Sequence, residues 1–434
     1  MMIANLALIV LAAAAPAAPA KILTLDEALA AARAQQPQVR QAAATTQAAL
    51  ARVDESLAPL LPQVNGSANY QRETANFASR PGSLPNQISG GTSGESWSTG
   101  NYYTLGLNAS VLLYDFGQSR SRWRSSQASA ASQKDSERAT LEQVLFSVRS
   151  AYFQARAAKE LVKVTSETLA NQQKHMEQTQ GFVEAGTQPE ISLAQAKTDV
   201  ANARVQLITA ENGYETAKAQ LNQAMGVEGT TDYDVADETL PAVDGEDGSI
   251  GVLLDESVKA RPELAALANQ IRAQELNVRS LRGAFGPTLG FSTGFSDAGQ
   301  QASSLVWNWS AGLALSVPIF QGGQTRAQVR EAEANLAAIR AQLDGERQQV
   351  RLEIEQARLA IRAARAALDA SDEALANARV RLQLAEGRYE TGVGSIIELG
   401  DSQVALTSAA QQTVQAEYSL AQARAGLLKA LGRE

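Results

Sequence analysis

One unusual segment occurs twice in this chain, and its repetition constrains the fold more than any other feature. Residues 106–120 read GLNASVLLYDFGQSR and residues 312–326 read GLALSVPIFQGGQTR, so the copies lie 206 positions apart. Each copy alternates apolar and polar residues as a β-strand does, and then changes to helical spacing after an aromatic residue and a glycine. The chain is therefore predicted to be internally duplicated, with a strand leading into a long helix in each half.

The points where strand becomes helix are predicted to be structural joints. They lie at Tyr114 and Gly117 in the first half and at Phe320 and Gly323 in the second. Aromatic side chains are enriched where a membrane meets water. Tyr114 and Phe320 are therefore expected to anchor the joints at a membrane surface.

Each half is also predicted to contain one β-hairpin. The first spans residues 63–114, with a Gly-, Ser-, Asn- and Thr-rich external loop over 71–101, and the second spans 288–319. One face of each strand is apolar, the other is small and polar, and aromatic residues lie near the strand ends, as in membrane β-strands. The apolar positions include Leu107, Ala109, Val111, Leu113, Leu289, Phe291, Phe295, Trp307, Trp309, Leu313, Leu315 and Val317.

A half-buried sheet of a soluble protein is the alternative to these membrane strands. Four strands cannot close a barrel, and open sheet edges are not tolerated in lipid. The membrane interpretation therefore requires several copies of the chain. Two copies would supply eight strands and three copies twelve, and both numbers are compatible with known barrels.

Long helices are predicted to follow each hairpin and to return after a glycine-containing turn. A tract of 64 residues would be roughly 96 Å long as one continuous helix, which a globular domain does not contain. The low aromatic content of 5% agrees with extended helices rather than a thick core. The long tracts are 117–180 and 323–386, and the returning helices are 191–225 and 396–431.

The first twenty residues, MMIANLALIVLAAAAPAAPA, are predicted to be a cleaved signal peptide. They combine an apolar run with an A-x-A site at Ala18, Pro19 and Ala20. An uncleaved anchor is the alternative, but the apolar run of residues 3–15 is shorter than the ~20 residues that a spanning helix needs.

The remainder is predicted to comprise a first repeat over 21–226, an acidic segment over 227–253 and a second repeat over 254–434. The acidic segment is interpreted as a solvated connector or a small side structure. Its acidic residues include Asp232, Asp234, Asp237, Glu238, Asp244, Glu246 and Asp247.

Composition argues against several functional classes. The net charge of −8 and the lack of a Lys/Arg cluster in the sequence argue against nucleic-acid binding. The absence of cysteine excludes disulfides, thiolate metal sites and thiol nucleophiles. The single histidine, His175, is interpreted as a solvated helix residue, and no triad, P-loop or metal-spaced cluster is found. The chain is therefore expected to be no enzyme and to need no cofactor or metal.

The duplicated signature, the paired turns and the stretch YETG…SIIELGDSQ at residues 389–403 resemble the TolC family of outer-membrane efflux proteins. The resemblance covers essentially the whole mature length. It implies an α+β membrane protein, a homotrimer in which a 12-stranded transmembrane β-barrel continues into a long α-helical barrel of coiled-coil helices. It also implies a location in the outer membrane of a Gram-negative bacterium, with the helices extending into the periplasm.

Such a protein would be the passive exit duct of a tripartite efflux or type I secretion system. Its expected partners are outer-membrane lipid, a periplasmic adaptor of the membrane fusion type and an inner-membrane pump. A periplasmic adaptor or a trimeric coiled-coil surface protein is the alternative function. An adaptor would have only one coiled-coil hairpin and compact β modules. The small, neutral strand residues leave the transported cargo open.

The resemblance also suggests residues for a gate at the periplasmic end. Glu398 and Asp401 match acidic positions that form rings at the closed aperture, and a tip tyrosine corresponds to Tyr389. Such rings select cations. Glu398 also stands three residues after Ser395, so an N-terminal cap explains it as well as a gate does. The turn residues Gly186, Thr187, Gly392, Val393 and Gly394 are the predicted adaptor-docking site.

Overall fold

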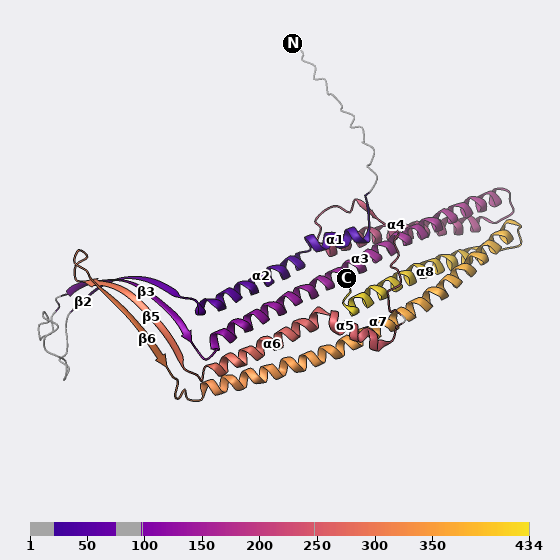
Figure 1. Cartoon of the computed structure of the whole chain (residues 1–434). Coiled ribbons are helices and arrows are strands. Elements are labelled where there is room, and N and C mark those ends of the chain that lie inside the picture. Colours follow the sequence, from indigo (N-terminus) through magenta and orange to yellow (C-terminus); the bar gives the residue numbers. More distant parts are fainter. Residues whose placement is uncertain (1–20, 75–96, 98, 247, 434) are drawn as a thin grey trace, which may run out of the picture. The chain divides into compact units, whose positions relative to one another are not determined.

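The computed structural model describes residues 21–74, 97, 99–246 and 248–433 (Figure 1). The predicted signal peptide, most of the first hairpin loop and Asp247 lie outside the described residues. In chain order, the elements are β1 (Lys21–Leu23), α1 (Leu25–Gln35), α2 (Pro37–Leu57), η1 (Ala58–Leu60), β2 (Gln63–Thr74), β3 (Thr99–Tyr114), α3 (Gln118–Glu184), α4 (Glu190–Met225), β4 (Tyr233–Val235), α5 (Ile250–Ala260), α6 (Pro262–Gly283), β5 (Thr288–Gly299), β6 (Val306–Ser316), α7 (Gln324–Glu390) and α8 (Ile396–Leu431).

The same succession of long elements occurs in both halves. A pair of antiparallel strands is followed by a helix of 67 residues, α3 or α7, and then by a helix of 36 residues, α4 or α8. Both 36-residue helices end at a glycine with left-handed backbone, Gly226 (φ 72°) and Gly432 (φ 67°), as helix C-termini prefer. The predicted helices are therefore present, and α8 has the predicted bounds.

The chain forms two compact units that each combine segments of both repeats. The sheet unit comprises Ala43–Ser136 and Glu263–Glu346. The helical unit comprises the described residues of Met1–Ala42, Glu137–Pro262 and Arg347–Glu434. Each compact unit is therefore built from corresponding segments of the two halves of the chain.

The sheet unit contains an antiparallel sheet with the strand order β2-β3-β5-β6 (Figure 1). Among the described residues, β2 and β6 each have a strand neighbour on one side only. Strand β6 is solvent-exposed along its whole length, with Trp307 71% and Leu313 68% exposed. In the part of the chain that the structure describes, two sheet edges and a wide apolar area are therefore left without a partner.

The register of the four strands separates two chemically different faces. Residues directly opposite in an antiparallel pair lie on the same face. On one face Phe291 lies between Val111 and Leu313, and Phe295 lies between Leu107 and Trp309. The other face carries small and polar residues in rows that cross the four strands. One row is Asn65, Asn108, Gly294 and Ser310, and the next is Gln63, Ser110, Ser292 and Gly312. The predicted alternation is confirmed over most of the sheet, but Thr293 and Asp297 lie on the apolar face and Leu112 lies on the polar face.

Two details of the strands differ from the prediction. Strand β6 ends at Ser316 rather than Ile319, because Pro318 has no N–H to continue the ladder. A register shift between Leu112 and Tyr114 interrupts the alternation, so that Tyr114 pairs with Leu289. A bulge of this kind cannot be derived from alternation alone.

The core of the helical unit is built by α1, α3, α4 and the short strands β1 and β4, which pair in parallel. Tyr152, Phe153 and Leu221 are its largest fully buried side chains. Elsewhere α4 packs through alanines at seven-residue spacing, Ala196, Ala203, Ala210 and Ala217, so the helices approach closely. No helix in the described part of the chain has the length and apolar character needed to cross a membrane.

Candidate functional site

Two turns with the same geometry connect the long helices of the helical unit. After α3, Thr187 N–H donates to the Phe182 carbonyl (2.9 Å) and Gly186 N–H to the Val183 carbonyl (2.9 Å). After α7, Val393 and Gly392 repeat these bonds at positions 206 residues later, at 3.0 and 3.1 Å. This is a Schellman motif, which requires a left-handed residue, and Gly186 (φ 73°) and Gly392 (φ 77°) supply it. The predicted turn residues therefore occupy two equivalent tips.

Tyr389 joins the two helical hairpins immediately behind these tips. Its hydroxyl lies 2.8 Å from the Thr179 hydroxyl of α3 and 3.3 Å from Gln188 Oε1. Its ring packs edge-on against Phe182, with centroids 5.7 Å apart, and the side chain is 1% exposed. The partners of Tyr389 could not be identified from the sequence; the only local signal was the helical spacing of Thr179 and Phe182 before the turn.

The two predicted gate carboxylates have different surroundings. Ser395 Oγ accepts the backbone N–H of Glu398 at 3.1 Å, so the predicted N-terminal cap of α8 is present. The Glu398 carboxylate also lies 3.5 Å from the Arg388 guanidinium. Asp401 is exposed, and the described residues provide it with no ion pair. Asp401 is therefore the freer of the two charges.

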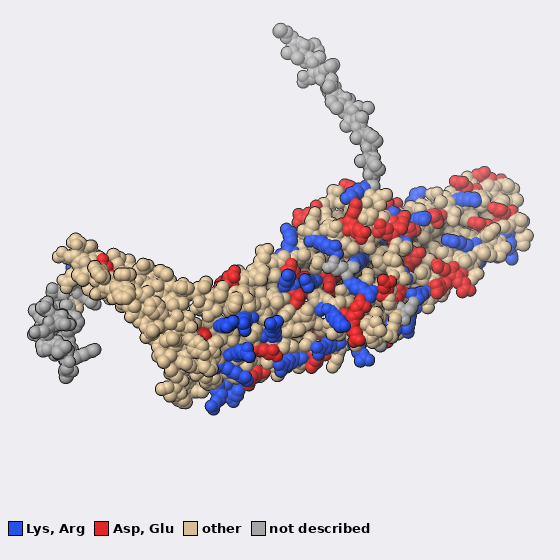
Figure 2. All heavy atoms as spheres, viewed as in Figure 1, with Lys and Arg blue, Asp and Glu red and all other residues tan. Residues whose placement is uncertain are grey.

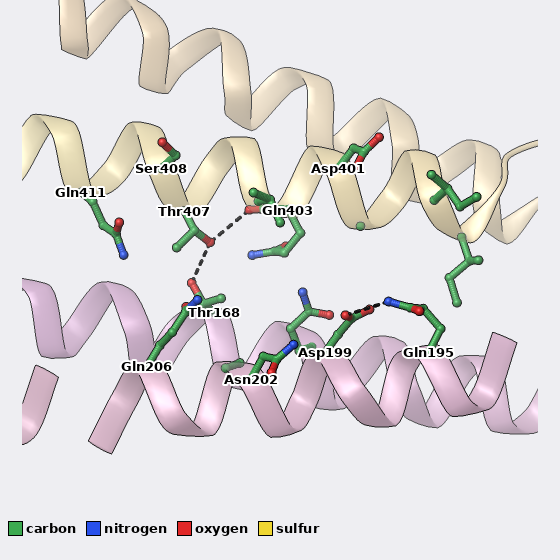
Figure 3. A pocket seen from close by; sticks show the side chains of 16 residues that line it. Thr168, Gln195, Asp199, Asn202, Gln206, Asp401, Gln403, Thr407, Ser408 and Gln411 are labelled. Carbon is green, nitrogen blue, oxygen red and sulfur yellow. Dashed lines mark hydrogen bonds between the residues drawn. The ribbon is translucent and has the colours of Figure 1, made fainter. Parts of the chain in front are cut away.

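Asp401 lines a polar groove between α8 and the α3–α4 hairpin, with a volume of about 510 Å³. Figure 3 shows Asp199 and Asn202 of α4 facing Asp401 and Gln403 of α8 across this groove. Burial raises the pKa of Asp199, and a hydrogen bond from Gln195 at 3.1 Å partly offsets that effect. The groove therefore contains two carboxylates among neutral amides, hydroxyls and aliphatic side chains. Hydrogen bonds within its wall include Thr168 to Thr407 (3.0 Å).

His175 was predicted to be a solvated helix residue, and that prediction is wrong. Its side chain is buried, with Nε2 3.4 Å from Glu386 of α7 and Nδ1 3.4 Å from Gln178. The burial arises because α3 and α7 pack together, which periodicity within α3 cannot show. Among the described residues, no group of three or more His, Asp or Glu side chains is arranged to hold a metal ion.

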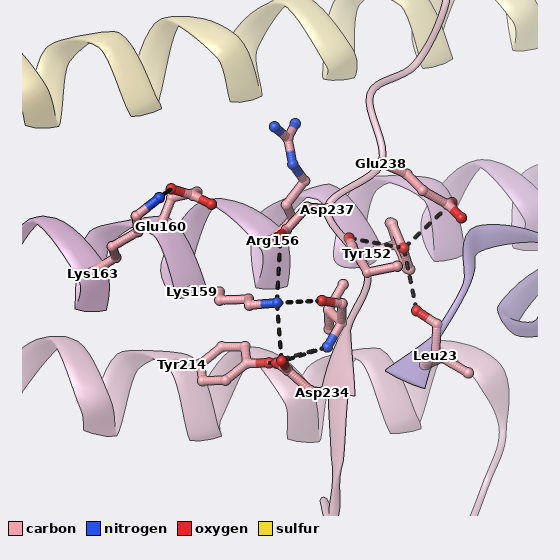
Figure 4. A network of polar contacts seen from close by, with 12 residues as sticks. Leu23, Tyr152, Arg156, Lys159, Glu160, Lys163, Tyr214, Asp234, Asp237 and Glu238 are labelled. Carbon is pink, nitrogen blue, oxygen red and sulfur yellow. Dashed lines mark hydrogen bonds and ion pairs between the residues drawn. The ribbon is translucent and has the colours of Figure 1, made fainter. Parts of the chain in front are cut away.

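A second polar cluster holds the acidic segment against α3 and α4 (Figure 4). Lys159 contacts Asp234 (3.0 Å), Asp237 (3.2 Å) and the Val235 carbonyl (2.7 Å). Although burial opposes ionisation, hydrogen bonds from Tyr214 and Lys159 outweigh it and lower the pKa of Asp234. The interpretation of residues 227–253 as a solvated connector is therefore wrong at this strand.

The same segment ends in a buried carboxylate. Glu246 is 5% exposed, and its oxygens lie 2.5 Å from Arg365 of α7 and 3.4 Å from Arg424 of α8. It also accepts the backbone N–H of Val243 at 2.9 Å. Asp234, Asp237 and Glu246 thus pair with basic residues of helices that are distant in sequence.

The two strand-to-helix joints differ in construction. At the first, Gly117 (φ 80°) follows Phe116, which itself has a left-handed backbone (φ 55°), and Asp115 accepts the Ser119 N–H at 2.5 Å as a helix cap. The Phe116 ring packs directly against Gly286, in the space that a side chain at position 286 would occupy. At the second, Gly323 (φ 83°) has the matching conformation. The predicted anchors are exposed, Tyr114 at 54% and Phe320 at 87%.

Comparison with known proteins agrees with this architecture. The family model described as outer membrane efflux protein matches residues 28–227 and 253–433. The chain is 27% identical over 417 residues to the pyoverdine export outer membrane protein OpmQ of Pseudomonas putida, covering 94% of this chain and 85% of that protein. It is 25% identical over 432 residues to the outer membrane protein TolC of Escherichia coli, covering 92% and 80%.

Solved structures show the same fold. The chain matches a CusC structure with a TM-score of 0.80 at 21% identity, covering 94% of this chain and 92% of that one. It matches the outer membrane protein VceC of Vibrio cholerae with a TM-score of 0.79 at 19% identity, covering 94% and 96%. The combination of long helices and a small sheet is therefore shared with these proteins over nearly the whole chain.

Proposed function

Because this chain belongs to the outer membrane efflux protein family, we propose that it is the outer-membrane exit duct of a tripartite efflux or type I secretion system. It is a TolC-family transport protein of the outer membrane, and its relatives are channel proteins rather than enzymes. In the proposed function, three copies enclose one passive conduit. An inner-membrane pump and a periplasmic adaptor would deliver the substrate to it.

The four-stranded sheet is the observation that carries this proposal. Its outer strands β2 and β6 each have an unpaired edge, and its two faces are apolar and polar. Unpaired edges are not tolerated in lipid, so strands of neighbouring copies must pair if the sheet spans a membrane. Three copies would join β6 of one chain to β2 of the next and close a barrel of twelve strands, within the known range.

The polar face of the sheet indicates a conduit with little selectivity of its own. Its central rows consist of Ser, Asn, Gln and Gly, and β3 and β6 contain no charged residue. Neutral amides and hydroxyls hydrate many solutes but bind none by charge. Similar proteins are named for pyoverdine export and for cation efflux, so we propose passive conduction without assigning a cargo.

The tips of the helical unit are the proposed gate and docking region. Three copies would place three Glu398 and three Asp401 carboxylates around one aperture, which would favour cations. Tyr389 would hold the aperture closed by tying α7 to α3. The tip residues Thr187 and Val393 are exposed and follow the left-handed glycines, so they are available to an adaptor.

Membrane insertion and channel formation test the proposed function. The full-length protein should fractionate with the outer membrane, migrate as a heat-resistant trimer on gels and form cation-preferring channels in a planar bilayer. A monomer released by washing the membrane with salt would contradict the proposal and favour a periplasmic adaptor or a surface coiled coil.

Docking is tested separately by photo-crosslinking in cells. A photoreactive residue at Thr187 or Val393 should capture a periplasmic adaptor, whereas the same residue at exposed Ala376 within α7 should not. If both tip positions yield only crosslinks between copies of this chain, the adaptor does not dock at the turns.

A further inference from the structure

Charge is distributed very unevenly within the sheet unit. Strands β3 and β6 have no charged residue, and the sheet is almost free of charge on the face seen in Figure 2. Basic side chains gather over the adjoining ends of the helices in the same view. A sheet with few charged residues thus meets a basic zone at the strand-to-helix joints.

Six exposed arginines make up this zone, which we call the arginine belt. Three of them lie within residues 120–124 in the first turns of α3, and the others come from the last turns of α6 and the first turns of α7, so only the fold brings all six to one end of the sheet unit. The described residues provide none of the six with an ion pair, whereas the nearby Arg282 and Arg340 are paired with Glu333 and Glu275. The belt consists of Arg120, Arg122, Arg124, Arg279, Arg326 and Arg330.

Two of these arginines, Arg120 and Arg326, lie in the first turns of α3 and α7, where they oppose the intrinsic preference of a helix. A helix N-terminus carries partial positive charge, so acidic residues are stabilising there and basic residues are not. Neither α3 nor α7 has an acidic residue in its first turn. The one carboxylate at the first joint, Asp115, is buried and already caps α3. Glu331 and Glu333 follow Arg330 on α7, but among the described residues neither forms an ion pair with a belt arginine, and Glu333 pairs with Arg282.

The apolar surface next to the belt indicates where the counter-charge comes from. Tyr114, Phe320 and Leu315 are exposed at the joint ends of the strands and helices, at 54%, 87% and 67%. An apolar band bordered by aromatic side chains and then by basic residues is the pattern of a protein surface that passes from the acyl chains of a bilayer to its headgroups. Phosphate groups lie at that depth, and arginine binds phosphate well because its guanidinium can donate two parallel hydrogen bonds.

We propose that the arginine belt binds the phosphates of anionic phospholipids in the leaflet at the joint. This inference rests on the proposed function, since it requires the strands to span the outer membrane. The belt would fix the depth of the sheet in the bilayer and would prefer anionic over zwitterionic lipid. Each arginine near an anionic surface changes affinity by about fivefold.

Lipid retention tests the proposal with the full-length protein. The protein is inserted into vesicles of phosphatidylcholine and phosphatidylglycerol, extracted in mild detergent, and its bound lipids are counted by native mass spectrometry. The wild type should be enriched in phosphatidylglycerol, and 0.5 M NaCl during extraction should reduce that enrichment because exposed charges are screened. Arg326→Gln with Arg330→Gln, and separately Arg120→Gln with Arg122→Gln and Arg124→Gln, should each lower the enrichment about fivefold per residue.

A matched control is available on the same helix. Arg379 and Arg381 are exposed on α7, have no ion pair among the described residues and lie far from the joint in sequence. Arg379→Gln with Arg381→Gln should leave the enrichment unchanged. The proposal would be overturned if the control and belt variants lost phosphatidylglycerol enrichment equally, or if neither belt variant lost any.

Other occupants of the belt would give different results. Loss of the trimer on gels with unchanged lipid enrichment would identify the belt as a contact between copies and overturn the proposal. If millimolar inorganic phosphate displaced phosphatidylglycerol from the wild type, the belt would be a site for a free anion, and the proposal would also be overturned. Failure of the wild type to insert or conduct would refute the proposed function, whereas conducting channels without anionic-lipid enrichment would refute the lipid site alone.

Discussion

The hydroxyl of Tyr389 on α7 lies 2.8 Å from the hydroxyl of Thr179 on α3, and the tyrosine side chain is 1% exposed. Thr179 also donates to the His175 carbonyl at 2.8 Å, so its oxygen is held in place by its own helix. The contact connects the two hairpins just behind their tips. Any separation of the hairpins at this end must break it.

Removal of the Tyr389 hydroxyl should therefore favour the open aperture. Tyr389→Phe keeps the ring against Phe182 but removes a buried hydrogen bond worth about 1 kcal/mol. We expect longer open times and a higher mean conductance in planar bilayers. Tyr418→Phe, on α8 and without a polar partner among the described residues, is the matched control and should behave as wild type.

The two gate carboxylates should differ in their effect on ion selectivity. Glu398→Ala and Asp401→Ala should both raise single-channel conductance and reduce cation preference, because each removes a ring of charge from the proposed aperture. Asp401→Ala should have the larger effect, since Glu398 is partly neutralised by Arg388 at 3.5 Å. Reversal potentials in a salt gradient measure the cation preference of each variant. Asp372→Ala, exposed within α7, serves as a control, and equal behaviour of all three variants would remove both residues from the gate.

Glu246 should be important for stability rather than conduction. Glu246→Gln leaves Arg365 and Arg424 without their shared carboxylate at a site where Glu246 is 5% exposed. Breaking a fully buried pair costs about 3–5 kcal/mol, and partial exposure of Arg365 should reduce this to roughly 2 kcal/mol. The thermal transition of the helical circular dichroism signal should fall, whereas Glu228→Gln at an exposed position should leave it unchanged. If Glu246→Gln and the wild type unfolded at the same temperature, the contacts of Glu246 with the two arginines would contribute no net stability.

The cluster around Lys159 predicts a pH dependence of stability. Hydrogen bonds from Tyr214 and Lys159 outweigh burial and lower the pKa of Asp234 below its unfolded value. The stabilisation is thus complete above the unfolded pKa of about 4 and is lost as pH falls through the folded pKa. Asp234→Asn should cost about 1 kcal/mol at pH 7, because the pair is partly exposed, and progressively less below pH 4. The free energy of unfolding of the wild type and of Asp234→Asn is measured from pH 7 to pH 3. If the difference between them stays constant over this range, ionised Asp234 is not its source.

Much of the fold was predictable because it depends on short-range periodicity. Alternation over the strands predicted both faces of the sheet, and glycines after helical tracts predicted the turns at Gly186 and Gly392. The bulge beside Tyr114 was not predictable, because it depends on pairing with β5 rather than on β3 itself. The division of the chain into repeats remains a prediction, since the compact units cross both halves.

The sequence by itself determined the duplication, the order of the elements, the cap at Ser395 and the family resemblance, because each depends on residues close together in the chain. Only the tertiary structure decided which side chains meet. Thr179 faces Tyr389 across 210 positions, Glu246 is neutralised by arginines more than a hundred residues away, and the belt draws its charges from three segments. Partner choice between distant helices depends on how they pack, and periodicity within one helix shows only which of its faces will be buried.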